Sequence, residues 1–136
     1  MININRLRKA MRHIVSKKGD LTLFALFRRA DGLGAWDLIV AAPWLEGSKY
    51  KSVSEIVDLL VESIGRKSLV NFARVEPIPA DNPTIKFILK NYPVDDGELR
   101  IPPTGLFDLP IEEVIILRAK RPATKKPARR ALQRAS

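Results

Sequence analysis

The stretch DLTLFALFRRADGLGAWDLIVAA, residues 20–42, decides the fold of this chain. Apolar side chains occupy both alternating faces of residues 20–29 and of residues 35–42, as in strands covered on both sides or partly shielded on the second. Between them, residues 30–34 place two glycines beside an aspartate, which favours a hairpin connection. Asp37 lies inside the second strand, where a carboxylate must be paired or at an edge, so we expect a structural ion pair there.

An amphipathic helix is expected before this hairpin. Residues 4–17 repeat apolar side chains at intervals of three and four, and Gly19 follows as a plausible end. Basic residues lie off the apolar stripe. The helix is therefore expected to pack on the core with a basic outer face, which is either simply solvated or binds phosphates or an acidic partner.

Two further helices are expected after the hairpin. The first follows Ser52, with Glu55 three residues later in the spacing of a capping box, and Gly65 ends it. The second is a short helix at 83–91 with Asn82 as its cap. A strand is the alternative for 83–91, because several of its residues also suit strands.

Three more strands complete the expected sheet. Prolines end the first of them, and an Asp-Asp-Gly turn precedes the second. The element order predicts a single compact α/β (α+β) domain over residues 1–117, with a mixed sheet of about five strands and about three helices. The expected strands are 69–75, 98–101 and 112–117.

Charge is unevenly distributed along the chain. Residues 1–18 carry six basic and no acidic residues, and residues 118–136 carry eight basic and no acidic residues. All 15 acidic residues therefore lie in 19–117, with the other 10 basic ones. The final segment, rich in Lys, Arg, Ala and Pro, holds a single large apolar residue, Leu132, and too little apolar surface to offset its ordering entropy. We expect it to be a disordered tail.

Composition excludes several classes of site. The chain has no cysteine and one histidine, His13, so disulfides, thiolate metal sites and ordinary nucleophilic triads lack their residues. Phosphate-binding glycine loops are absent from the sequence. No apolar run is long enough for a membrane span, and the N-terminus does not read as a signal peptide. We expect a soluble cytoplasmic protein without a cofactor.

A weak enzymatic pattern remains among the acidic residues. Carboxylates at a strand end beside Arg100 are loosely the equipment of a metal-dependent nuclease. Arginine cannot act as the base, however, and Asp-Asp-Gly is also an ordinary turn, so the turn interpretation is favoured. The candidate catalytic residues are Asp81, Asp95, Asp96 and Glu98.

The basic ends are the stronger functional signal. Clustered cations attract DNA or RNA phosphates through counterion release, without reading sequence. The tail has no aromatic residue for base stacking. Trp44 beside Tyr50 is the alternative stacking candidate, although core packing is favoured for both tryptophans. The candidate phosphate contacts are Arg8, Lys9, Arg12, Arg118, Lys120, Arg121, Lys125, Lys126, Arg129, Arg130 and Arg134.

Three hypotheses follow from these residues. The first is a non-enzymatic binding or accessory module that attaches to nucleic acid through its basic termini. The second is a small metal-dependent phosphodiesterase that uses the four carboxylates. The third is a subunit of a larger assembly, in which strand 35–42 or its edge pairs with another chain. The possible protein partners are therefore a strand-pairing protein or, for the basic segments, an acidic one. The alternative to the first hypothesis is that the tail only increases solubility and has no dedicated partner.

Overall fold

Five strands form one mixed sheet in the spatial order β3-β2-β1-β5-β4. The computed structural model describes residues 3–30, 34–45, 49–102 and 110–121. Neighbouring strands are antiparallel except β2 and β3, which are parallel. The bounds are α1 Ile4–Lys18, β1 Leu23–Arg29, β2 Trp36–Ala41, α2 Lys49–Ile64, the 3-10 helix η1 Arg66–Asn71, β3 Phe72–Pro77, α3 Pro83–Asn91, β4 Leu99–Ile101 and β5 Ile111–Ala119.

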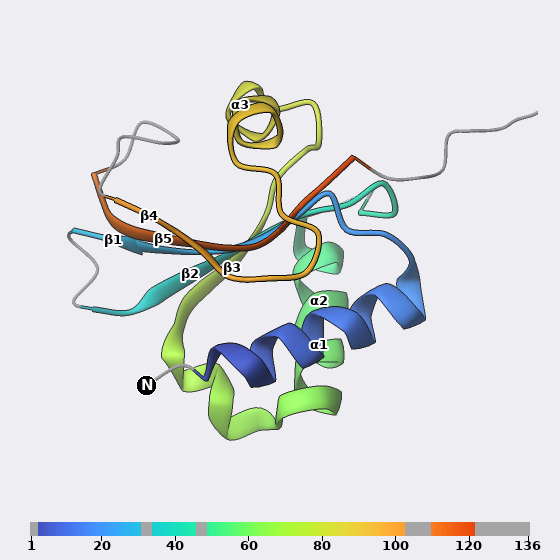
Figure 1. Cartoon of the computed structure of the whole chain (residues 1–136). Coiled ribbons are helices and arrows are strands. Elements are labelled where there is room, and N and C mark those ends of the chain that lie inside the picture. Colours follow the sequence, from blue (N-terminus) through green and yellow to red (C-terminus); the bar gives the residue numbers. More distant parts are fainter. Residues whose placement is uncertain (1–2, 31–33, 46–48, 103–109, 122–136) are drawn as a thin grey trace, which may run out of the picture.

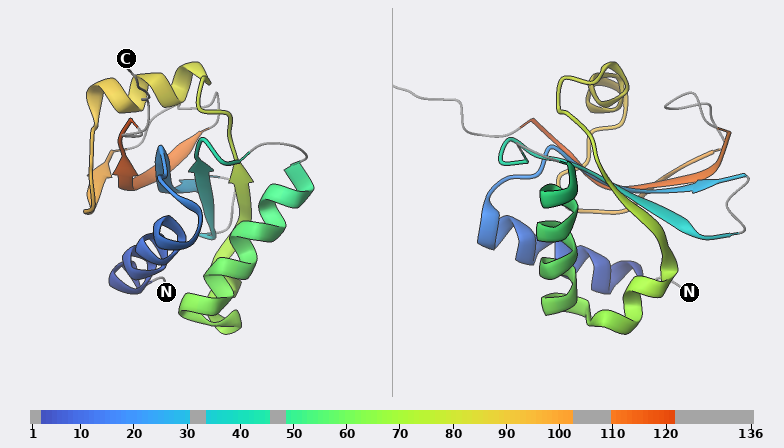
Figure 2. Two further views of the ribbon diagram at one scale, coloured as in Figure 1. Left: turned by 90° about the vertical axis from the view of Figure 1, so that its right-hand side faces the viewer. Right: turned by 180° about the vertical axis from the view of Figure 1, so that it is seen from behind.

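Helices cover the sheet on both sides. Figures 1 and 2 show α1 and α2 on one face and α3 on the other. The alternation of side chains along each strand supplies both layers, since Leu38 and Val40 of β2 join the α1–α2 core while Ile39 and Ala41 join the α3 core. The expected single α+β domain is confirmed, and the apolar runs at both parities reflect a sheet covered on two faces.

The predicted hairpin forms as expected. Phe27 of β1 pairs with Asp37 of β2, and the ladder continues to Leu23 and Ala41. Residues 31–33 of the expected turn lie outside the described residues. The buried Asp37 carboxylate lies 2.8 Å from Nε of Arg29 and 3.3 Å from Nε of Arg74, which confirms the expected structural ion pair.

The first and third helices agree with their sequence patterns. Asn3 caps α1 by accepting from the Arg6 amide, and Gly19 ends the helix with a φ of 112°, a value that favours glycine. Asn82 caps α3 by accepting from the Thr84 amide. Residues 83–91 therefore form a helix, and the alternative strand is not adopted.

Two predicted boundaries are wrong. Helix α2 begins at Lys49, so Ser52 is a buried residue inside the helix and not its cap. No glycine or proline lies between Gly47 and Ser52, so the chain can enter helix α2 before Ser52, and the prediction overlooked this. The strand expected at 69–75 is displaced, because η1 takes up residues to Asn71 and β3 begins at Phe72.

Side-chain hydrogen bonds hold η1 in place of a strand. The Ser68 hydroxyl donates to the Ile64 carbonyl at 3.0 Å, and the Asn71 amide donates to the Ser68 carbonyl at 3.1 Å. Local polar bonds of this kind compete with strand pairing. The prediction of a strand from residue 69, which rested on apolar content alone, was therefore wrong for residues 69–71.

The last strand also runs further than predicted. β5 continues through Arg118 and Ala119, and both residues pair with β1. Ala119 forms two more backbone hydrogen bonds, of 3.0 and 2.7 Å, with Val94. The folded part of the chain therefore extends beyond Leu117, where the sequence placed the start of the tail. None of the helices that the structure describes has the length and the apolar composition of a membrane span.

Candidate nucleic-acid interface

The basic face of α1 contacts the turn before β4. Arg12 Nε lies 2.6 Å from Oδ2 of Asp96, and Arg8 Nε lies 3.1 Å from Oδ1 of the same carboxylate. The hydrogen bond from Arg12, aided by Arg8, lowers the pKa of Asp96. Two of the expected phosphate contacts are thus engaged by an internal acid, and Lys9 remains exposed without an ion pair among the described residues.

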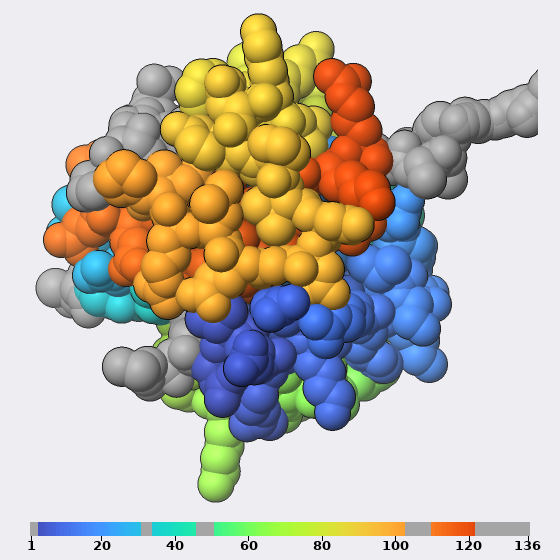
Figure 3. Space-filling model, in the orientation of Figure 1, coloured from blue at the N-terminus to red at the C-terminus, as the bar shows by residue number. Residues whose placement is uncertain are grey.

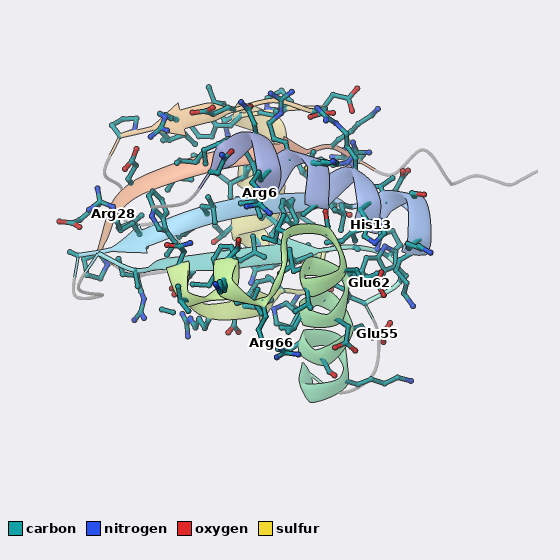
Figure 4. The ribbon with its side chains drawn as sticks, turned by 90° about the horizontal axis from the view of Figure 1, so that it is seen from below. Arg6, His13, Arg28, Glu55, Glu62 and Arg66 are labelled. Carbon is teal, nitrogen blue, oxygen red and sulfur yellow. The ribbon has the colours of Figure 1, made fainter. Side chains whose placement is uncertain are left out.

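Two other polar side chains of α1 contact α2. His13 Nε2 lies 2.9 Å from Oε1 of Glu62, and Lys18 Nζ lies 2.7 Å from Oε2 of Glu55. Figure 4 shows His13 and Glu62 pointing toward each other from the two helices. The Lys18 contact lowers the pKa of Glu55. These pairs give the only histidine a role in packing two helices together.

The four candidate catalytic carboxylates are engaged in separate interactions or dispersed. Asp95 lies 3.1 Å from Arg118 and 3.4 Å from Lys120, whereas Glu98 lies 2.9 Å from Arg100. Asp81 is exposed just before α3. Within the described ranges no three acidic or histidine side chains are grouped so that they could hold a metal ion. The described part of the chain therefore does not gather these four carboxylates into one metal site.

Arg118 is a structural residue of β5. Its side chain is only 12% exposed and donates to the Leu21 carbonyl at 2.9 Å and to the Asp95 carbonyl at 3.0 Å. Its guanidinium also lies 3.6 Å from the Asp20 carboxylate. This residue is therefore not available as a flexible phosphate contact. Arg121 is exposed at the end of the described chain, and the remaining predicted contacts, Lys125, Lys126, Arg129, Arg130 and Arg134, lie outside the described residues.

The outer face of α3 carries cations that the sequence interpretation overlooked. Ile85 and Ile88 are fully buried, so the opposite side of the helix faces outward with Lys86, Phe87 and Lys90 exposed. Residues three and four apart lie on one side of a helix, which brings these three together. Neither lysine has an ion pair among the described residues, and α3 itself contains no acid.

A shallow hollow connects this helix with the end of β5. It has a volume of about 390 Å³ and lies between the C-terminal end of α3 and the last residues described. Figure 3 shows the surface of α3 next to that of the end of β5. The hollow is lined by Leu89, Pro93, Val94, Asp95, Ala119, Lys120 and Arg121. The C-terminal basic segment therefore begins beside the C-terminal end of α3.

Neither tryptophan is an exposed stacking platform. The Trp44 indole donates to the carbonyls of Gly19 at 3.2 Å and Asp20 at 3.0 Å, and Lys18 lies 5.6 Å from its ring centre. Trp36 packs against the α1–α2 core, with Arg28 at 5.5 Å from its ring centre. Among the side chains that the structure describes, the exposed aromatic ring is instead that of Phe87, at 48%. We refer to Lys86, Phe87, Lys90, Lys120 and Arg121 as the α3–β5 corner.

The strand proposed for pairing with another protein is inside the sheet. β2 is hydrogen-bonded to β1 on one side and to β3 on the other. Its backbone groups are therefore already paired within the sheet, and strand 35–42 itself is not open to a partner strand. The outer edge of β3 ends in Pro77, which has no amide hydrogen to donate.

Comparison with known proteins adds no functional assignment. No protein-family model, no curated protein and no solved structure matches the chain.

Proposed function

We propose that this chain is a non-enzymatic module that attaches to nucleic acid by sequence-independent contacts with phosphates. The C-terminal basic segment makes most of these contacts, and the α3–β5 corner adds to them. The observation that carries the proposal is the position of Arg121. It lines the same hollow as Leu89, near the C-terminal end of α3, and the 15 residues after it carry five basic and no acidic side chains.

The ion pairs of the folded body support assigning most of the phosphate contacts to the C-terminal segment. The arginines at positions 8, 12, 100 and 118 all bind carboxylates of the body, so the folded part neutralises much of its own charge. Lys86, Lys90 and Arg121 have no such partner among the described residues. Unpaired cations gathered at one corner are what a phosphate backbone attracts.

Phosphate contacts carry no sequence information. Lysine and arginine on an exposed helix and an adjoining segment bind through charge and counterion release, which is the chemistry of non-specific binding. Arg8 and Arg12 no longer belong to the proposed interface, because Asp96 already binds both of them.

Binding to short oligonucleotides tests the proposal. We compare the full chain with a chain that ends at Arg121, using fluorescence anisotropy and several unrelated sequences of one length. The full chain should bind all sequences with similar affinity, and the shortened chain should bind them much more weakly. Equal affinity of the two chains would contradict the proposal, as would a strong preference of the full chain for one sequence.

A further inference from the structure

Phe87 is an unusual exposed residue in the described part of the chain. It and Val70 are the large apolar side chains exposed there, at 48% and 84%, and only Phe87 is aromatic. It lies on a helix whose buried side is already filled by Ile85 and Ile88. Packing of α3 on the sheet therefore does not account for this ring.

The surroundings of Phe87 are cationic. Lys86 precedes it and Lys90 follows it by one turn, all on the outward side of α3. The Tyr92 ring meets it at 6.2 Å between centres with an angle of 66° between planes, which is an edge contact and not a parallel stack. An exposed aromatic ring on a helix face that also carries two lysines can contact a base while the lysines bind its neighbouring phosphates.

We propose that the α3–β5 corner selects single-stranded nucleic acid, with an unpaired base stacked on Phe87 and phosphates bound by Lys86 and Lys90. This inference rests on the proposed function and specifies its substrate. The bases of a duplex are stacked on one another, so their faces are not open to an external ring. Stacking on Phe87 should therefore favour a single strand over a duplex of equal charge, whatever the base sequence.

An acidic protein segment is the competing occupant of the same corner. It would use Lys86 and Lys90 through charge, but it has no base to place on the ring. Strands that carry phosphates without bases separate these two possibilities, because they preserve the charge and remove the stacking partner.

The test uses the full chain and the variant Phe87→Leu, which keeps an apolar side chain on the helix and removes the ring. The probes are an oligothymidine strand, a fully abasic strand of the same length and a duplex. Stacking on one base predicts about tenfold weaker binding of the thymidine strand by the variant. Affinity for the abasic strand and the duplex should stay unchanged, and Phe87→Trp should keep the affinity for thymidine.

Val70→Ala is the matched control. Val70 is also an exposed apolar residue near two cations, Arg66 and Lys67, but it has no ring, so its truncation should change none of the three affinities. Unchanged thymidine binding by Phe87→Leu, or an equal loss on the abasic strand, would overturn the inference. So would polyglutamate that displaces the thymidine strand as effectively as it displaces the abasic one.

The two proposals fail in different ways. If Phe87 is not a stacking residue, the full chain still binds abasic strands more tightly than the chain ending at Arg121 does. If the cationic segment does not bind phosphates, that difference disappears for every probe.

Discussion

Single arginines join parts of this chain that are far apart in sequence. Arg118 contacts Asp20 and Asp95, and Arg12 contacts Asp96 from the opposite end of the chain. A guanidinium suits this role because it donates in a planar fork and stays charged. At the residue scale, an arginine that is paired with a carboxylate of the body has a structural role. An arginine without such a partner can bind a ligand.

Asp37 is a buried charged residue whose loss should lower stability. Its carboxylate is almost fully buried, Oδ2 faces Arg29 and Arg74, and Oδ1 has no hydrogen-bond partner. We expect Asp37→Ala to lower the free energy of unfolding by about 3 kcal/mol, because removing one partner leaves the others uncompensated. Urea denaturation measures this. Asp58→Ala, at an exposed position on α2, is the control, and a similarly small change in both variants would show that the pair contributes little.

The Asp96 contact should depend on pH. Arg12 and Arg8 lower its pKa in the folded state, so its contribution is complete above the ordinary value of about 3.9 and is lost as pH falls through the lowered pKa. The stability difference between the parent chain and Asp96→Asn should therefore be constant from about pH 5 to 8, and it should shrink at acid pH and vanish only below the lowered pKa.

Thermal unfolding across that pH range measures the difference, and Asp81→Asn serves as an exposed control. A difference that persisted undiminished at acid pH would mean that Asp96 stabilises the chain by something other than its charge.

Helix α3 has one side that packs in the core and one side that faces outward. Its inner face fills the second core with Ile85 and Ile88, and its outer face holds Lys86 and Lys90. Because the outer lysines do not support packing, their charge can be removed without disturbing the fold.

The double variant Lys86→Gln, Lys90→Gln should weaken binding of a single strand and leave the melting temperature unchanged. Removing two phosphate contacts should reduce the log–log salt slope by about 1.4. Arg66→Gln with Lys67→Gln on η1 removes the same charge from a different surface and should alter binding much less. Equal losses in the two double variants would mean that only net charge matters.

Strand β5 sets the C-terminal limit of the fold. A chain that ends at Leu117 loses the pairing of Ala119 with Val94, the bond from the Lys120 amide to the Thr22 carbonyl, and the contacts of Arg118. At about 1 kcal/mol for each lost hydrogen bond, we expect it to be less stable by at least about 3 kcal/mol. A chain that ends at Arg121 keeps these bonds and should unfold as the full chain does.

Calorimetry of the two shortened chains checks this expectation. Equal melting temperatures would show that Arg118 and Ala119 are not needed for the fold.

Local patterns predicted the elements that depend on local physics. The hairpin and α1 follow from residue spacing, and α3 follows from spacing and from its cap Asn82, all of which act over a few residues. The strand at 69–75 was misplaced because hydrogen bonds of Ser68 and Asn71, and not apolar content, decide that segment.

The candidate site was less predictable, because it depends on contacts between distant residues. Nothing near Arg118 in the sequence shows that Asp20 and Asp95 lie beside it, so it was grouped with the tail. The outward face of α3 could have been predicted, because the spacing of Lys86, Phe87 and Lys90 on an expected helix already places them together. Its exposure, however, became clear only from the packing of the helix.

At the scale of the whole molecule, internal pairing and external charge are separated in space. The acids of the described body are largely paired with its own arginines, whereas the basic residues after Arg121 have no acid near them in the sequence. Such a molecule should associate quickly with polyanions and release them as salt is raised.

The salt dependence of affinity for a single strand tests phosphate binding by the C-terminal segment most directly. The log of the binding constant is measured against the log of salt concentration for the full chain and for the chain ending at Arg121. If all five basic residues beyond Arg121 bind phosphates, the slope of the full chain should be steeper by about 3.5. Parallel lines for the two chains would contradict the proposed function.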